Sequence, residues 1–83
     1  MVEQYFAYVI KSQKDGRLYK GMSSDLDRRI NEHNMGNNKS TKSYCPWILV
    51  YSEQFGTRKE ASNREKYLKS GIGREYLKNI LAP

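Results

Sequence analysis

Cysteine and histidine are almost absent from this sequence, and their scarcity excludes several kinds of site. The chain has one cysteine, Cys45, and one histidine, His33. A lone cysteine cannot close a disulfide within the chain, and one thiol with one imidazole cannot build a structural zinc site of the usual kind. We therefore expect no disulfide framework and no structural zinc, as in proteins of the reducing cytoplasm.

Long apolar runs are missing as well. The apolar run near the start, Tyr5 to Ile10, is far shorter than the roughly 20 residues of a membrane-spanning helix, and no basic leader precedes it. The chain also lacks repeats, low-complexity tracts and a long linker. We expect residues 1–83 to form one soluble, cytoplasmic domain without a membrane partner.

Acidic residues are few compared with basic ones. Lys and Arg number 15 against 9 Asp and Glu, which gives a formal net charge of +6 and an isoelectric point near 9.6. A basic protein is attracted to polyanions, because contacts with phosphates release condensed counterions. The same charge would also serve solubility, so composition alone leaves both interpretations open.

Turn and strand signals predict a sheet of three strands. Residues 5–10 form a β-rich run, and the Asp15-Gly16 pair predicts a hairpin with a two-residue turn before a second strand at 18–21. The third strand is apolar on both faces from Trp47 to Tyr51, so we expect it in the centre of the sheet.

Helix signals occupy the remaining segments. Two pairs match the capping-box pattern, Ser24 with Asp27 and Thr57 with Glu60. Gly36 and Gly71 are expected to end the two helices that follow, and a shorter third helix is expected over residues 74–81. The predicted fold class is α/β (α+β), with a three-stranded, mainly antiparallel sheet flanked by three helices.

The two adjacent arginines of the first helix are not equivalent. At about 100° per residue, Leu26, Ile30 and His33 share one sector, Arg29 lies at its edge and Arg28 points nearly the opposite way. Arg29 and His33 are therefore expected side by side next to the sheet. An arginine at such a border could equally rest its stem on the core and keep its head in water.

The second helix places a carboxylate on its inward face. Ala61, Glu65 and Leu68 are spaced i, i+4 and i+7 and share one side. A buried carboxylate is costly unless it is paired or bound to a cation. Glu65 is therefore either in a structural ion pair with Arg29 or Arg64, or a metal ligand or acid/base group between the helices.

Two tyrosines of the predicted hairpin share a face. With a two-residue turn, Ser12 is expected opposite Tyr19 and Ile10 opposite Gly21. Tyr8 then lies on the Tyr19 side, but about four residues away along the strands, roughly 13 Å. Strand twist, the length of the side chains or a longer turn would have to bring the phenols together. Either tyrosine could instead be a packing residue.

The order and spacing of these segments resemble the GIY-YIG nuclease domain, in its small stand-alone form, from about Tyr5 to Leu81. The matching segments are FAYVI, LYKG, SSDLDRRINEH, KSTK, PWILVY and KEASNREKYLKSG. The residues at the family's motif positions are Tyr8, Tyr19, Gly21, Arg29, His33 and the metal-binding Glu65. Lys20 replaces the usual apolar residue of the second motif, but it alternates away from the Tyr19 face and should leave the site intact.

The resemblance implies a metal-dependent DNA endonuclease that hydrolyses phosphodiester bonds in DNA repair, recombination or the processing of structured DNA. It implies Mg²⁺ or Mn²⁺ at Glu65, stabilisation of phosphate charge by Arg29 and a tyrosine general base. We favour Tyr19 as the base, with Tyr8 positioning water or phosphate and His33 orienting or transferring a proton.

A basic loop follows the first helix. We expect it to grip the nucleic-acid backbone without reading bases. The residues assigned to backbone contacts are Lys39, Ser40, Thr41 and Lys42 of the loop, with Arg28 of the helix. The alternatives are a solvated surface loop and, for the whole chain, a non-catalytic nucleic-acid-binding module that retains the fold. A homodimer or a protein partner that supplies specificity is compatible with either function.

Overall fold

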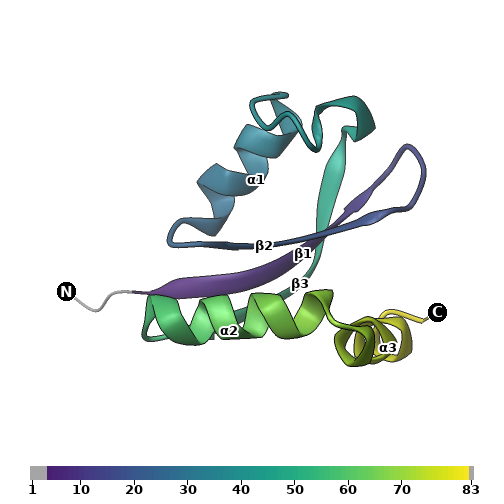
Figure 1. Ribbon diagram of the computed structural model, residues 1–83. Coiled ribbons are helices and arrows are strands. Elements are labelled where there is room, and N and C mark those ends of the chain that lie inside the picture. Colours follow the sequence, from purple (N-terminus) through teal and green to yellow (C-terminus); the bar gives the residue numbers. More distant parts are fainter. Residues whose placement is uncertain (1–3, 83) are drawn as a thin grey trace.

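The computed structural model describes residues 4–82 and confirms the predicted fold class (Figure 1). The elements are strands β1 (Tyr5–Ser12), β2 (Leu18–Ser23) and β3 (Trp47–Phe55), helices α1 (Leu26–Asn34), α2 (Arg58–Lys69) and α3 (Gly71–Ile80), and a 3₁₀ turn at Lys42–Tyr44. The strands form one antiparallel sheet in the order β2-β1-β3. No helix within the described residues is long and apolar enough to span a membrane.

The centre of the sheet is β1, so the prediction of a central third strand was wrong. Residues 7–10 of β1 are all buried, and β1 pairs with a strand on each side. β3 lies at an edge, where Ile48 and Leu49 are 44% and 42% exposed. The composition of an apolar run does not show whether strands pair with it on both sides or on one side only. The apolar residues of β3 therefore predicted a central strand although β3 lies at the edge.

Helices cover both faces of the sheet (Figure 1). Helix α1 lies on one face, and α2 and α3 lie on the other. Alternate side chains of β1 feed a separate buried cluster on each side. The α1 side holds Tyr8, Ile10 and Trp47, and the α2 and α3 side holds Ala7, Val9, Leu68 and Leu77.

The β1–β2 hairpin has a wider connection than the predicted two-residue turn. Tyr8 pairs with Gly21 and Ile10 pairs with Tyr19, which shifts the register by two residues from the prediction. The cause is the Ser12 hydroxyl, which accepts hydrogen bonds from two successive loop N–H groups at 3.0 and 3.3 Å. An even shift keeps both tyrosines on one face and halves their separation along the strands.

The helix caps agree only in part with the capping-box prediction. Thr57 caps α2 as predicted, and its hydroxyl accepts from the Glu60 N–H at 3.2 Å. Asp25, rather than Ser24, caps α1 by accepting from the Arg28 N–H at 3.2 Å. Serine and aspartate are equally good caps, so two adjacent candidates leave the start of a helix uncertain by one residue.

Of the two glycines predicted to end helices, only one does so. Gly36, with φ +80°, follows the end of α1 as expected. Gly71 does not end α2, because Ser70 serves as the C-cap of α2 and the N-cap of α3. Helix α3 therefore begins three residues earlier than predicted. Gly73 allows this tight junction, since a Cβ there would collide with the backbone of α2.

Candidate active site

A buried pair of polar side chains joins β1 to α1. The Tyr8 hydroxyl lies 2.9 Å from His33 Nε2, and the two residues are 1% and 0% exposed. Burial raises the pKa of Tyr8 to about 12. Burial, together with the nearby Arg29 charge, lowers the pKa of His33. At neutral pH both groups are therefore uncharged.

Thr41 holds the other side of the imidazole. Its hydroxyl lies 2.8 Å from His33 Nδ1 and donates to the Asn38 carbonyl at 3.4 Å. A hydroxyl that donates to a carbonyl accepts from the Nδ1–H, so His33 presents an unprotonated Nε2 to the Tyr8 hydroxyl. The Thr41 carbonyl also accepts from Trp47 Nε1 at 3.0 Å. Thr41 is 0% exposed, so it lies in the interior and not on the loop surface where we expected a contact with nucleic acid.

The remaining residues of the basic loop lie on the surface. Lys39, Ser40 and Lys42 are exposed and flank the buried Thr41. The loop is anchored through Asn34, whose side chain accepts from the Trp47 N–H at 2.6 Å and donates to its carbonyl at 3.1 Å. The lysines are therefore free to contact a ligand next to the His33 corner of the fold.

Gly21 lets the phenol of Tyr8 lie across β2. These two residues are cross-strand partners, and a Cβ on Gly21 would stand 2.5 Å from the Tyr8 hydroxyl and 2.6 Å from its Cζ. The hydroxyl thus occupies the space above β2 that a side chain would otherwise fill. The glycine of the second motif is therefore required by the tyrosine of the first motif.

We expect Gly21→Ala to lower the free energy of unfolding by about 1–3 kcal/mol, because the phenol must move to make room for the methyl group. If the site is catalytic, cleavage should also fall roughly tenfold as Tyr8 leaves its place. Urea unfolding and rate measurements test this. Gly56→Ala is the matched control, because a Cβ there meets nothing within 4 Å. Equal effects of the two substitutions would contradict the expectation.

Arg29 and Arg28 differ as helical spacing predicts. The Arg29 side chain is 36% exposed and pairs with Glu32 at 3.0 Å, whereas Arg28 is 68% exposed and 3.9 Å from the same residue. Glu32, with smaller contributions from Tyr8 and Tyr19, raises the pKa of Arg29. Arg29 in turn contacts Tyr8 and opposes the effect of burial on the pKa of that phenol. Arg29 therefore lies beside both phenols.

Tyr19 completes the polar group on the α1 side. Its ring packs edge-on against His33, with 4.9 Å between ring centroids, and against Trp47 at 6.4 Å. The side chain is half-buried, in contrast to the fully buried Tyr8. The two tyrosines therefore share a face, as predicted, but they differ in their access to solvent.

Glu65 lies on α2, the helix that packs on the face of the sheet opposite α1. Its side chain is 22% exposed, and Oε2 lies 3.1 Å from Lys69 Nζ. Neither arginine expected as a structural partner pairs with it, because Arg29 binds Glu32 and Arg64 binds another glutamate. The Glu65 charge makes a small contribution to the raised pKa of Tyr8, so the carboxylate acts electrostatically on this phenol.

A divalent cation fits Glu65 only together with a substrate. Within residues 4–82 no group of three or more His, Cys, Asp or Glu side chains could hold a metal ion. Zinc prefers three or four protein ligands, whereas Mg²⁺ keeps several waters and is often bound by one carboxylate plus substrate phosphates. The second oxygen of Glu65 makes no hydrogen bond or ion pair to any described residue. This donor set therefore fits Mg²⁺ or Mn²⁺ and does not fit zinc.

His33 should make the stability of the fold depend on pH. Its pKa is lowered from the usual 6.5, so the unfolded chain binds the proton more readily. The free energy of unfolding should therefore fall as the pH drops through about 6.5, and the loss should continue down to the pKa of the folded state. Urea unfolding at several pH values tests this. His33→Gln should remove the dependence in this range, and an unchanged profile in that variant would contradict the expectation.

Two phenols, an imidazole and a guanidinium thus gather on the α1 side of a small α+β sheet, and the charge of the Glu65 carboxylate on α2 acts on one of the phenols. This arrangement is typical of a phosphoryl-transfer site that relies on positioning and charge. The GIY-YIG catalytic domain matches residues 4–76, and the chain belongs to this family. Membership implies a nuclease-type function, for which the family typically uses a divalent metal.

The chain is similar to several small proteins named UPF0213. It is 40% identical over 80 residues to one from Staphylococcus saprophyticus, covering 95% of this chain and 96% of that protein. It is 37% identical over 78 residues to one from Staphylococcus haemolyticus, covering 93% and 94%. The solution NMR structure of a UPF0213 protein from Bacillus halodurans covers 93% of this chain and 84% of that chain, with 31% identity and a TM-score of 0.56.

Proposed function

We propose that this protein is a metal-dependent endonuclease that hydrolyses phosphodiester bonds in DNA, in repair, recombination or the processing of structured DNA. The observation that carries the proposal is the convergence of Tyr8, Tyr19 and His33 on the Arg29 guanidinium. A purely structural arginine needs one acidic partner, and Arg29 already has Glu32. Its further placement beside two phenols serves a reaction that develops negative charge.

Arg29 is the group that stabilises the phosphate. Hydrolysis builds negative charge on the phosphoryl oxygens, and a planar guanidinium can donate two hydrogen bonds to them. The Arg29 side chain is 36% exposed, so a phosphate can reach it from solvent. Arg28, on the outward side of α1, contacts the nucleic-acid backbone together with Lys39, Ser40 and Lys42 of the basic loop.

Tyr19 is the general base in this proposal. Tyr8 is buried, has a pKa of about 12 and donates to His33, so it holds its proton firmly. Tyr19 is half-buried and lies beside Arg29, so its hydroxyl is open to solvent and close to the guanidinium proposed to bind the phosphate. Tyr19 relays a proton: its oxygen takes the proton of the attacking water while its own phenolic proton passes to solvent, and Tyr8 with His33 holds the neighbouring hydrogen-bond network in place.

Glu65 is the residue that would hold the divalent cation. A bound ion would supply charge neutralisation at the phosphate and would make the attacking water more acidic. The chain itself contributes a carboxylate with one uncommitted oxygen, while the other oxygen pairs with Lys69.

The proposed function is tested by incubating the purified protein with labelled duplex, nicked, single-stranded and branched DNA in the presence of Mg²⁺, Mn²⁺ or a chelator. We expect cleavage of at least one substrate with metal and none with chelator. The Glu65→Ala variant, prepared in the same way, controls for contaminating nucleases. Binding without metal-dependent cleavage would favour the non-catalytic binding module instead.

Thr41 has a positioning role that Thr41→Val should reveal. Valine has nearly the same shape but leaves the His33 Nδ1–H buried without an acceptor, which lowers the free energy of unfolding by about 1–3 kcal/mol. We expect cleavage to fall roughly tenfold under conditions where the variant is folded, with a changed pH profile of kcat. Thr41→Ser should restore both. A rate and pH profile equal to those of the wild type would limit Thr41 to a structural role.

A further inference from the structure

A groove lies between the β1–β2 hairpin and α3, on the side of the sheet opposite α1. Its volume is about 420 Å³. Its lining includes the cationic residues Lys20, Arg74 and Lys78 and the apolar residues Leu18 and Leu77. Arg17 also lines it, but its guanidinium pairs with Asp15 and stacks on the Tyr44 ring, 3.5 Å from the ring centroid. We call this the α3 groove. None of its side chains belongs to the candidate active site described above.

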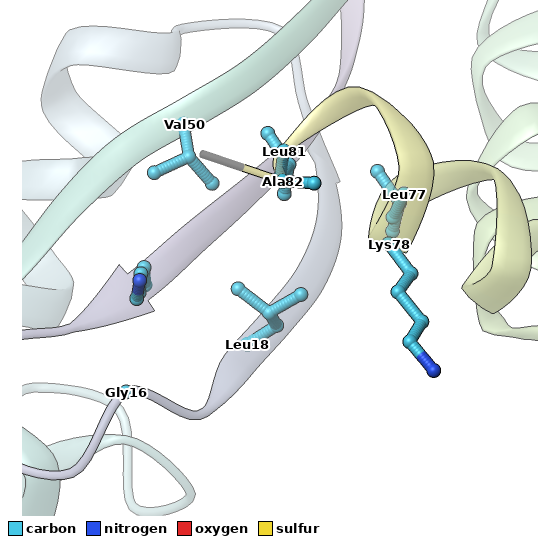
Figure 2. Close-up of a pocket in the computed structure, with 8 residues that line it drawn as sticks. Gly16, Leu18, Val50, Leu77, Lys78, Leu81 and Ala82 are labelled. Atoms are coloured by element: carbon cyan, nitrogen blue, oxygen red, sulfur yellow. The ribbon is translucent and has the colours of Figure 1, made fainter.

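The groove continues into a second hollow of about 250 Å³, shown in Figure 2. Leu18 of β2 faces Leu77 and Leu81 across this hollow, and the Lys78 side chain extends away from the leucines. Lys11 of β1 also lines it. The whole concave surface therefore combines apolar contacts with ammonium groups that are free to turn toward a ligand.

Three of the four cations that line the α3 groove lack acidic partners. Arg17 pairs with Asp15 at 2.8 Å, but Lys20, Arg74 and Lys78 make no ion pair within residues 4–82. Like charges held close together repel one another, and a bound anion would relieve that repulsion. A solvated charged surface would spread these groups apart, whereas here they line one concavity.

The repulsion between like charges is clearest at Lys20. It lies on β2 with its pKa lowered, first by burial and then by the charges of Arg74 and Lys69. Glu65, one helical turn before Lys69, already forms an ion pair with Lys69 and none with Lys20. Lys20 is thus a partly desolvated ammonium close to two other cations, and it shares the lining of the α3 groove with one of them, Arg74.

We propose that the α3 groove binds the sugar–phosphate backbone of the nucleic acid whose scissile phosphate lies at the candidate active site. The proposal rests on the proposed function. Tyr19 and Lys20 are neighbours on β2, so their side chains project to opposite faces of the sheet. β2 is an edge strand, so a nucleic acid that passes its outer edge meets the catalytic face and the α3 groove together.

Contacts in the α3 groove are independent of sequence and sensitive to salt. Each neutralised phosphate of duplex DNA changes the slope of log K against log salt by about 0.9. Removing Lys20 and Arg74 should therefore lower the slope by roughly 2 and weaken binding about tenfold at moderate salt. The catalytic groups are untouched, so kcat should stay the same while KM rises.

The experiment compares Lys20→Gln/Arg74→Gln with Lys59→Gln/Lys66→Gln, which removes the same charge from exposed positions of α2. Binding of a fluorescently labelled DNA duplex, and of its separate strands, is measured over a series of salt concentrations. Cleavage of the best substrate from the activity assay is measured in parallel. Circular dichroism confirms that both double variants are folded.

A loss of affinity and salt slope in the groove variant alone, with kcat unchanged, supports the proposal. Equal affinities and slopes in the two double variants overturn it, even if the wild-type protein cleaves DNA. If no protein cleaves DNA but the groove variant still loses affinity, the endonuclease function fails and the backbone-binding groove stands. A loss of kcat at saturating DNA in the groove variant would also contradict the proposal, because the groove would then act on the chemistry.

Discussion

Replacing Arg29 with alanine is expected to lower metal-dependent cleavage roughly 10³-fold, because the transition state loses its main guanidinium donor. Arg29 lies beside both phenols and is open enough to meet a phosphate. Its ion pair with Glu32 is partly exposed, so the substitution should change stability little. Binding of DNA should weaken only as far as one phosphate contact requires.

Arg28→Ala is the matched control for this experiment. It removes the same charge from the adjacent residue, whose side chain is 68% exposed and points away from the sheet. We expect a weaker salt-dependent affinity and an unchanged rate at saturating DNA. Arg29→Lys should restore little activity, since an ammonium cannot make the paired hydrogen bonds of a guanidinium. Loss of chemistry in the Arg28 variant at unchanged binding would refute the assignment of helical faces.

Replacing Glu65 with alanine should abolish the response of cleavage to Mg²⁺, again with a loss on the order of 10³-fold. The carboxylate is the candidate metal ligand, and one of its oxygens is uncommitted. DNA binding in the absence of metal should persist or improve, because a negative charge has been removed near the phosphate path. Cleavage rates are measured as a function of metal concentration.

Two further variants separate a metal ligand from a structural ion pair at Glu65. Lys69→Ala removes the cation that competes for the carboxylate, so it should lower the metal concentration needed for half-maximal cleavage. If the Glu65–Lys69 pair is purely structural, Lys69→Ala should leave the metal concentration for half-maximal cleavage unchanged. Glu75→Gln, at an exposed position of α3, is the control for the loss of negative charge in Glu65→Ala. An Mg²⁺ response that survives in Glu65→Ala would remove Glu65 from the proposed site.

Local patterns predicted most of the elements and their order. The Thr57 cap and the periodicity of α1 and α2 depend on residues close in the chain, and the structure confirms them; the DG signal predicted the hairpin but not its wider turn. Two errors lie where two local signals compete. Ser24 and Asp25 are both good caps, and Gly71 can equally follow one helix or begin the next.

The sequence did not predict several contacts between segments that are distant in the chain. The Ser12 hydroxyl widened the hairpin, and the position of β3 at the sheet edge depended on pairing that no local pattern encodes. Thr41 read as a surface residue of a polar loop, yet it holds the imidazole of His33. A single threonine among lysines and serines carries no signal that separates a buried hydroxyl from an exposed one.

The sequence by itself determined the family, the fold class and the unequal placement of Arg28 and Arg29. These follow from spacing along single elements, which the fixed geometry of helices and strands converts into direction. Only the tertiary structure decided that Tyr8 is buried on His33, that Gly21 makes room for it and that Lys20 faces Arg74 across a groove. Those relations arise when side chains from separate elements exclude water together, and their distances are set by packing rather than by position in the chain.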